Sequence, residues 1–390
     1  MTIVFVTPWY GQDISGGAEA EVRRTAEHLR EAGLPAEVWT TCVRDFRADW
    51  SQNYHRPGRS NENGVPVWRF PVRRRNRDAF DVVNLKLMHG LSITPEEEQI
   101  YVQENVCSPA LTQQIAEHRE TTRFCFIPYM FGTTYWGIKM CPRDAFLIPC
   151  LHDEAYVRLG VFRDMLSLVH RLILHTPAEL ALARSLCDLP DEAFVLMGEG
   201  VDMDFTTNGP AFRQKYNVVG SFVLYAGRKD HGKNVEQLVD FFRRYRAYRG
   251  PVCELVMIGG GSSPGADQSG DGIRDLGFVP AQDKYNAYAA ATVLCHPSLQ
   301  ESFSLVMMEA WAAGTSVLAH GDCAVTREHC VRSNGGLYFT NYPEFETCVD
   351  LMLSQPTLRR RLAAHGQDYV RRNYRWDTIV ARYQNLFAKE

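Results

Sequence analysis

Apolar runs of strand length alternate with amphipathic stretches from the first residues of the chain onward. Residues 3–6 form an apolar run that predicts a buried strand, and the loop after it ends in Gly16–Gly17. Apolar residues then recur at helical spacing over residues 18–32, and a second apolar run follows at 36–40. A strand, a glycine-containing loop, a helix and a strand in this order are typical of a β-α-β unit in a parallel sheet.

The same alternation continues through two series of predicted elements. In the first half, five further runs have the length of strands in the same sheet: residues 65–70, 123–127, 146–149, 172–175 and 194–197. After a polar, turn-rich stretch at 206–210, the second series predicts strands at 222–226, 254–258, 273–279, 293–296 and 316–319, and helices at 234–248, 305–313 and 376–388. The pattern therefore predicts an α/β protein of two doubly wound halves that meet near residue 208.

Two segments depart from this pattern. Residues 259–272 are rich in Gly, Ser and Asp, which predicts a mobile loop. Arg73, Arg74, Arg75 and Arg77 form a basic cluster that precedes an amphipathic stretch. The cluster is either a solvated loop or a patch that docks on an anionic lipid surface, and the sequence leaves both interpretations open.

Composition narrows the class of protein without indicating its chemistry. The chain has 390 residues, enough for two or three domains, and its hydrophobic and charged fractions of 45% and 23% are ordinary globular values. The net charge of −4 gives no sign of a nucleic-acid partner. No apolar run of about 18 residues and no secretory signal are evident, and the 11 cysteines include no CxxC pair. We therefore expect a soluble cytoplasmic protein with reduced thiols.

A basic loop between a predicted strand and a predicted helix is the first candidate for chemistry. Arg228 and Lys233 stand five residues apart in this loop, directly after the strand at 222–226. Ligands of open α/β sheets bind at the carboxyl ends of the strands. Arg228 with its planar fork and Lys233 with its point charge can close on one diphosphate. A solvated basic loop is the alternative.

Two glutamates near a later strand are the second candidate. Glu301 lies in the loop after the strand at 293–296, and Glu309 lies inside the apolar helix that follows. A carboxylate is a bidentate acceptor suited to the vicinal hydroxyls of a ribose or a sugar ring. The amides of Phe303 and Ser304 form a helix N-terminus, which favours anions.

Together these motifs resemble the family-four retaining glycosyltransferases of the GT-B fold. Glu301 and Glu309 match the two glutamates of that family, which are separated by seven residues, and Arg228 and Lys233 match its diphosphate clamp. The resemblance covers nearly the whole chain. It includes the glycine loop Gly16-Gly17-Ala18-Glu19, the closing segment of the first domain at Gly200-Val201-Asp202, and residues 374–388 with Trp376, which resemble a helix that returns to the first domain.

The resemblance implies a GT-B architecture of two Rossmann-like domains facing across a cleft. An acceptor-binding domain is expected over residues 1–207, and a domain that binds a nucleotide sugar is expected over residues 208–373. A helix at about 374–390 is expected to pack back onto the first domain.

The roles of family residues carry over position by position. Glu309 is expected to hold the ribose hydroxyls, and Glu301 the hydroxyls of the donor sugar. His152 resembles the family histidine near the reacting sugar, with an ordinary core histidine as the alternative. Catalytic roles are implied for Glu301, His152, Arg228 and Lys233. The other residues expected to contact the donor are Gly16, Gly17, Gly259, Gly260, Phe278, Phe303, Ser304 and Leu305.

The resemblance also implies a mechanism. Arg228, Lys233 and the helix N-terminus stabilise the leaving diphosphate without a metal or a cofactor, and a donor phosphate oxygen takes the acceptor proton, so that the anomeric configuration is retained. Ser302 and Ser304 stand where the family commonly has glycine. Serine is small and keeps its amide, so the anion site is expected to survive, although the sugar preference can differ.

Three rival functions remain open. Asp202-Met-Asp204 is formally an Asp-x-Asp motif of a metal-dependent transferase. Glu301 and Glu309 are also the residue types of a glycoside hydrolase, although that assignment leaves the basic loop without a role. The third rival is a catalytically silent subunit that binds a nucleotide sugar in a polysaccharide assembly complex.

The resemblance favours a UDP- or GDP-linked hexose as donor and a saccharide or lipid-linked saccharide as acceptor. The commonest role of the family is bacterial surface polysaccharide biosynthesis, such as that of lipopolysaccharide. If the acceptor is lipid-linked, Arg73, Arg74, Arg75 and Arg77 are expected to contact the inner face of the cell membrane.

Overall fold

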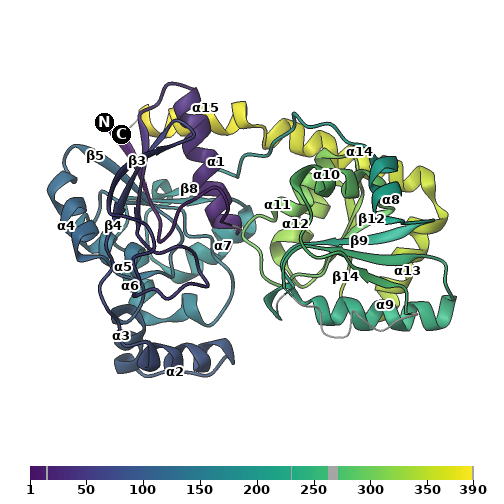
Figure 1. Ribbon diagram of the computed structural model, residues 1–390, viewed down its shortest axis with the longest axis horizontal. Helices are drawn as coiled ribbons and strands as arrows, with labels where there is room; N and C mark the ends of the chain where they lie inside the picture. The colour runs from purple at the N-terminus through teal and green to yellow at the C-terminus, as the bar shows by residue number, and fades with distance from the viewer. Residues whose placement is uncertain (15, 230, 262–270, 389–390) are drawn as a thin grey trace. The chain divides into compact units, whose positions relative to one another are not determined.

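The computed structural model describes residues 1–14, 16–229, 231–261 and 271–388 (Figure 1). The loop predicted at 259–272 lies for the most part outside the described residues. The chain divides into two compact units. The first unit comprises Met1–Gly200 together with Ile379–Glu390, and the second comprises Val201–Thr378.

The first unit is built on an eight-stranded sheet with the order β3-β4-β2-β1-β5-β6-β7-β8. Neighbouring strands are parallel except for the antiparallel pair β3 and β4. The strands are β1 (Thr2–Val6), β2 (Ala36–Thr41), β3 (Gly58–Glu62), β4 (Val65–Phe70), β5 (Thr122–Phe126), β6 (Phe146–Leu147), β7 (Arg171–Leu174) and β8 (Phe194–Leu196). The helices up to the end of this sheet are α1 (Gly17–Glu31), α2 (Arg77–Met88), α3 (Pro95–Gln103), α4 (Pro109–His118), α5 (Gly132–Met140), α6 (Gly160–Leu166) and α7 (Pro177–Leu186).

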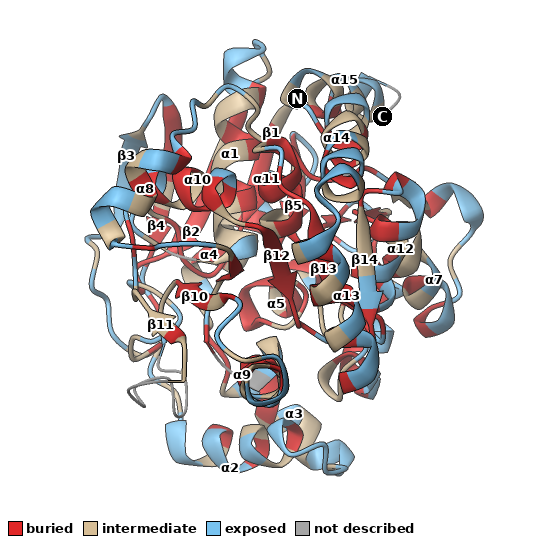
Figure 2. Cartoon of the chain, turned by 90° about the vertical axis from the view of Figure 1, so that its right-hand side faces the viewer, coloured by how far each residue is buried: buried red, intermediate tan, exposed pale blue. Residues whose placement is uncertain are grey.

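The second unit contains a six-stranded parallel sheet with the order β11-β10-β9-β12-β13-β14. Its strands are β9 (Phe222–Ala226), β10 (Glu254–Ile258), β11 (Ile273–Asp275), β12 (Val293–His296), β13 (Val317–His320) and β14 (Gly336–Phe339). Its helices are α8 (Gly209–Tyr216), α9 (Val235–Arg249), α10 (Ala281–Ala290), α11 (Leu305–Ala312), α12 (Ala324–Ser333), α13 (Tyr342–Ser354) and α14 (Pro356–Asn373). β12 is buried at every position, as Figure 2 shows, because helices cover both of its faces.

The last helix, α15 (Trp376–Ala388), packs against the first unit from Ile379 onward. The phenol of Tyr383 is buried, the ring of Phe387 lies 5.2 Å from that of Phe146, and Arg382 donates a hydrogen bond to the carbonyl of Met197. Both ends of the described chain therefore belong to the same unit.

Both sheets have a topological switch point, where the strand order reverses. In the first unit it lies between β1 and β5, and in the second unit it lies between β9 and β12. Ligands of doubly wound sheets bind beyond the carboxyl ends of the strands at such a point. The loops after these four strands are therefore the places where a site is expected.

The sequence pattern predicted the α/β class with two doubly wound halves, and the two sheets confirm it. Residues 58–62 were not expected to form a strand, because β3 is polar throughout and mostly exposed at the sheet edge. The strand predicted at 273–279 ends at Asp275, whose carboxylate accepts a hydrogen bond from the amide of Gly277 at 2.9 Å. Gly277 itself has a φ of +63°, which ends the extended backbone.

Candidate functional site

The loops after β9 and β10 pack directly against each other in the second unit. The amide of Gly227 donates to the carbonyl of Ile258 at 3.0 Å, and the amide of Lys229 donates to that of Gly260 at 2.8 Å. A Cβ at Gly259 would stand 2.0 Å from the carbonyl oxygen of Gly227, so only glycine fits there. A Cβ at Gly260 would meet no atom within 4 Å of those compared, which leaves the space beside that residue accessible.

Lys229 fastens this pair of loops to the sheet, a role that its place in a basic motif did not predict. Its ammonium group is completely buried and lies 2.8 Å from a carboxylate oxygen of Asp275. It also donates to the carbonyl of Gly259. The ammonium group of Lys229 is paired inside the fold and therefore cannot reach a ligand. The neighbouring side chain of Arg228 is exposed and can reach one.

Lys233, Glu301 and His296 form the central network of the candidate site. Lys233 lies two residues before α9 and donates to Glu301 Oε1 at 2.6 Å. His296, at the carboxyl end of β12, places its Nε2 3.0 Å from the same oxygen. The Ser304 hydroxyl lies 3.2 Å from that ring nitrogen. The loops on both sides of the β9–β12 switch point are thereby joined through one carboxylate.

The charges in this network determine the protonation state of Glu301. Burial by itself raises the pKa of a carboxyl group, but Lys233 and His296 beside Glu301 hold its pKa well below the usual range. Glu301 is therefore an anion at neutral pH. An anion in this position accepts hydrogen bonds from hydroxyl groups. It also repels a phosphate group, so the phosphates of a ligand must be bound by cationic side chains of the protein.

At Phe303, just before α11, the backbone rather than the buried side chain can face a ligand. The Phe303 ring is buried, with its centroid 4.9 Å from Tyr374 and 5.5 Å from His329. Ser304 caps α11 with a left-handed φ of +73°, a conformation that favours glycine. Leu305 follows as the first helical residue. Only the main chain at 303 and 304 is thus placed to meet a ligand, together with the Ser304 hydroxyl.

Glu309 lies one turn into α11 and already has partners within the unit. Lys284 of α10 donates to both of its carboxylate oxygens, at 2.7 and 2.8 Å, and the Tyr288 hydroxyl donates at 3.0 Å. Lys284 and Tyr288 were not predicted to belong to the site. A ribose at Glu309 would have to share this carboxylate with them. Phe278, also expected at the site, is 79% exposed beyond the end of β11.

The sequence-predicted residues of the first unit lie on two loops of its sheet. Gly16 caps α1 and Gly17 begins it, close to a hydrogen bond of 2.7 Å from Trp9 Nε1 to Glu19 Oε1. His152 follows β6 and is partly exposed, with its Nδ1 3.8 Å from Glu154. Burial raises the pKa of Glu154 to about 7, although the Tyr129 hydroxyl donates to it at 3.1 Å.

Asp202 and Asp204 of the Asp-x-Asp motif have different surroundings. Asp202 Oδ1 accepts a hydrogen bond from Trp376 Nε1 at 2.7 Å. Asp204 instead lines a pocket of about 390 Å³ together with Arg371 and Arg375. Among the residues that the structure describes, the group of His, Cys, Asp and Glu side chains close enough to share a metal ion contains neither aspartate.

The arginines of the basic cluster have contacts within the first unit. Arg73 lies 3.6 Å from Glu104, and Arg77 lies 3.1 Å from Asp81. The guanidinium of Arg75 lies over the ring of Trp50, 4.8 Å from its centroid. Much of the charge that the sequence pattern assigned to a surface is therefore balanced locally.

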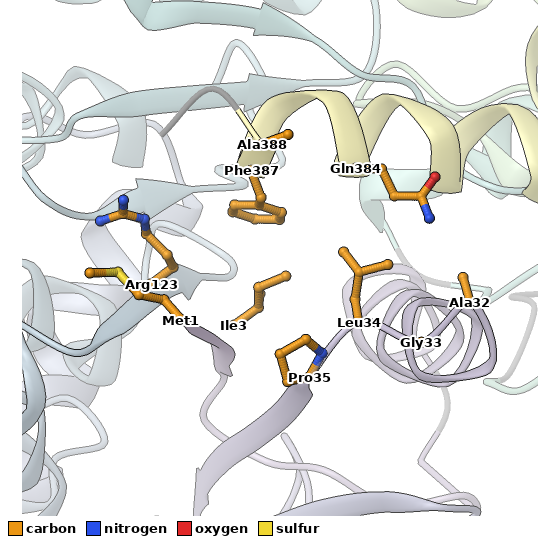
Figure 3. Close-up of a pocket in the computed structure, with 10 residues that line it drawn as sticks. All are labelled: Met1, Ile3, Ala32, Gly33, Leu34, Pro35, Arg123, Gln384, Phe387 and Ala388. Atoms are coloured by element: carbon orange, nitrogen blue, oxygen red, sulfur yellow. The ribbon is translucent and has the colours of Figure 1, made fainter.

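A pocket of about 600 Å³ lies at the opposite end of the first sheet (Figure 3). Ile3 and Arg123, at the amino-terminal ends of β1 and β5, contribute to it, and the ring of Phe387 points into it from α15. Because ligands of such sheets bind at the carboxyl ends of the strands, this pocket is separate from the candidate site.

Comparison with known proteins adds the family of the second unit. Residues 211–369 match the family described as Glycosyl transferases group 1. A phosphatidyl-myo-inositol mannosyltransferase of Mycobacterium tuberculosis is 30% identical over 242 residues, which are 59% of this chain and 63% of that protein. The chain thus spans less than two thirds of the length of this curated relative.

Solved structures resemble the entire chain. A sucrose-phosphate synthase from Thermosynechococcus elongatus has a TM-score of 0.72 at 18% identity, and Anabaena HepE in complex with UDP and glucose has a TM-score of 0.71 at 16% identity. Each comparison covers 100% of both chains. The chain therefore has the GT-B fold, with two Rossmann-like sheets. Within it, residues 211–369 are the part that is similar to the group 1 glycosyl transferases. None of the described helices is both long and apolar enough to cross a membrane.

Proposed function

We propose that this protein is a retaining hexosyltransferase that moves a sugar from a UDP- or GDP-linked donor to a saccharide or lipid-linked saccharide. The observation that carries this proposal is the network of Lys233, Glu301 and His296 at the switch point of the group 1 domain. Support comes from the names of similar proteins, one a mannosyltransferase and another solved with UDP and glucose. The biosynthesis of bacterial surface polysaccharides is the pathway class that we propose.

The donor diphosphate binds to Arg228 and Lys233. Lys233 donates to Glu301 in the structure, and donor binding exchanges that partner for phosphate oxygens. Glu301 then accepts hydrogen bonds from the sugar hydroxyls, held in place by His296. Glu309 accepts hydrogen bonds from the ribose hydroxyls and shares its carboxylate with Lys284 and Tyr288. Gly260 offers the open backbone along which the nucleotide lies, with Gly259 beneath it and Phe278 at the rim.

The transfer itself needs charge stabilisation of the departing nucleotide diphosphate. Arg228, Lys233 and the amides of Phe303, Ser304 and Leu305 supply it. A donor phosphate oxygen takes the proton of the acceptor hydroxyl while the anomeric bond breaks, so the configuration is retained and no protein base is required. The first unit is the acceptor-binding domain in this proposal, with Gly16, Gly17 and His152 near the reacting groups.

Docking on a membrane is the second part of the proposal. Three apolar side chains on α2 are strongly exposed: Val82 at 60%, Leu85 at 55% and Met88 at 66%. They follow the basic cluster directly, and Arg74 stands between the arginines that have acidic partners. An exposed apolar helix face beside cationic side chains fits an anionic lipid surface. We propose that α2 and this cluster hold the protein on the membrane that contains its acceptor.

The decisive experiment combines ligand screening with transfer. A thermal-shift screen of UDP, GDP and their hexose conjugates identifies the donor class, since a ligand stabilises the fold that binds it. With that donor, Glu301→Gln is expected to lower kcat/KM at least about 100-fold, as expected for the loss of a contact to the reacting sugar. The matched control is Glu346→Gln, which removes a surface carboxylate of the same unit that pairs with Arg249.

Several outcomes would contradict the proposal. Hydrolysis of a glycoside without any nucleotide would favour a hydrolase, and tight binding of a nucleotide sugar without turnover would favour a silent subunit. Dependence on added Mg²⁺ or Mn²⁺ that disappears in Asp202→Asn or Asp204→Asn would favour the metal-dependent transferase. Full transfer by Glu301→Gln would remove Glu301 from the site.

A further inference from the structure

Three side chains of metal-ligating type converge inside the first unit. Glu21 comes from α1, Cys150 from the loop after β6, and His175 from the residue directly after β7. One ligand atom of each lies within 4.8 Å of the other two. Glu21 Oε1 is 3.1 Å from His175 Nε2, and Cys150 Sγ is 3.7 Å from Glu21 Oε2. The proposed transfer reaction uses none of them.

The chemistry of these donors fits one metal in particular. A thiolate, an imidazole and a carboxylate are the ligand types of zinc, with bond lengths of about 2.0–2.3 Å. Ligand atoms around a tetrahedral zinc lie about 3.5 Å apart. The observed separations therefore need only small side-chain movements to enclose an ion. Glu21 and His175 are buried, and Cys150 is partly exposed.

A fourth side chain holds the two ligand-bearing loops in place. Glu179 of α7 accepts a hydrogen bond from the amide of Leu151, next to Cys150, at 2.7 Å. Its other oxygen accepts one from the amide of His175, also at 2.7 Å. Such outer contacts orient the ligands of metal sites and reduce the cost of assembling them.

Further carboxyl groups surround the three side chains. Those of Glu179 and Glu199 act electrostatically on both Cys150 and His175, in addition to that of Glu21. An ion pair between Glu21 and a protonated His175 leaves the Cys150 thiol beside a carboxylate oxygen. A zinc ion binds the neutral imidazole and the thiolate, and the proton of each passes to solvent, so that the ion, Glu21 and the thiolate together carry no net charge.

We propose that Glu21, Cys150 and His175 bind one zinc ion in the first unit, with a water molecule at the fourth position. The ion ties the first turns of α1, just after Gly17, to the loop that carries His152 two residues after Cys150. Its role is to hold these two segments, and no step of glycosyl transfer passes through it. The inference is independent of the proposed function, since it concerns only metal binding by the folded chain.

The test measures metal binding directly. The full chain, purified without chelator, is expected to contain one equivalent of zinc by elemental analysis. After chelator removes it, Co²⁺ is expected to bind with a sulfur-to-cobalt charge-transfer band. Cys150→Ser should abolish that band, and Cys150→Ser, His175→Asn and Glu21→Gln should each weaken zinc binding about 100-fold or more. Cys187→Ser, which removes a buried thiol of the same unit, should keep both properties.

The wild-type measurements stand even where a variant fails to fold. Zinc content far below one equivalent, together with no thiolate band on adding Co²⁺ to the native protein, would overturn the proposal in favour of the Glu21–His175 ion pair. Unchanged zinc affinity in a folded Cys150→Ser variant would overturn it as well.

Discussion

At the scale of single residues, His329 links the candidate site to the core behind it. Its ring packs against that of Phe303, and its Nδ1 lies 3.0 Å from the Tyr369 hydroxyl. Burial, reinforced by the positive charge of Arg332, lowers the pKa of His329 to about 3. The imidazole is therefore neutral in the folded protein over the whole physiological range.

This neutral histidine predicts acid sensitivity of the second unit. The unfolded chain takes up a proton near pH 6.5, whereas the folded chain takes it up only near pH 3, so stability falls as the pH drops between these values. Between pH 7 and pH 5 the loss from this group is about 2 kcal/mol. Urea unfolding of His329→Phe should show a loss smaller by that amount, while His365→Gln, at a partly exposed histidine of the same unit, keeps the wild-type difference. Equal losses in all three proteins would contradict the assignment.

The residues of the site that sequence patterns could predict are those whose roles depend on spacing. Arg228, Lys233 and Glu301 lie between strands and helices at one switch point, and Glu309 lies in α11 after the second of these loops. His296, Lys229 and Lys284 were not predicted, because each acts through a buried contact. The partners of Lys229 and Lys284 are also distant in sequence, and only the structure shows the ammonium group of Lys229 inside the fold.

At the scale of elements, the pattern succeeded where burial is two-sided and failed at edges. β9, β10 and β12 have the predicted limits because their apolar runs are nearly continuous. β3 has no apolar run at all, since it only borders the sheet. β14 is half exposed and includes a glycine, so its signal was too weak. The amphipathic stretch after the arginine cluster is the helix α2.

The exposed face of α2 predicts binding to lipid. Phe80, Val83 and Leu87 point into the unit, while Val82, Leu85 and Met88 remain exposed. Flotation with vesicles of anionic phospholipid should recover the wild-type protein. Replacing the three exposed residues by serine should weaken binding at least about tenfold, because each apolar side chain contributes on the order of 1 kcal/mol on insertion.

Controls separate insertion from general stickiness. Val219→Ser and Val331→Ser remove exposed apolar residues of the second unit and should leave flotation unchanged. Neutral vesicles should bind the wild type less well than anionic ones if Arg74 and its neighbours contribute. Undiminished flotation of the α2 variant would remove this surface from the proposal.

At the scale of the whole molecule, the two sheets confirm the two doubly wound halves that the pattern predicted, and the likeness to solved structures confirms the GT-B fold that the family resemblance implied. The units join at Gly200–Val201 and again at Thr378–Ile379. The sequence pattern predicted the boundary between the two halves near residue 208, at the turn before α8, because turn-forming residues mark the start of a new element. The contacts that a linker makes depend on packing, which a local sequence pattern does not show. Val201, for example, forms an isolated bridge with Arg375 within the second unit.

Two units with separate cores predict two responses to ligands in calorimetry. The proposed donor site lies in the second unit, so a saturating nucleotide at about 100 times its Kd should stabilise that unit by about 2.7 kcal/mol. Its transition should rise by roughly 5–10 °C, and that of the first unit should not move.

The substitution Met257→Ala leaves a cavity in the core of the second unit and so identifies which transition belongs to that unit. Zinc removal should lower only the other transition. A nucleotide that raised the first unit's transition alone would place the donor site there, against the network of Lys233, Glu301 and His296.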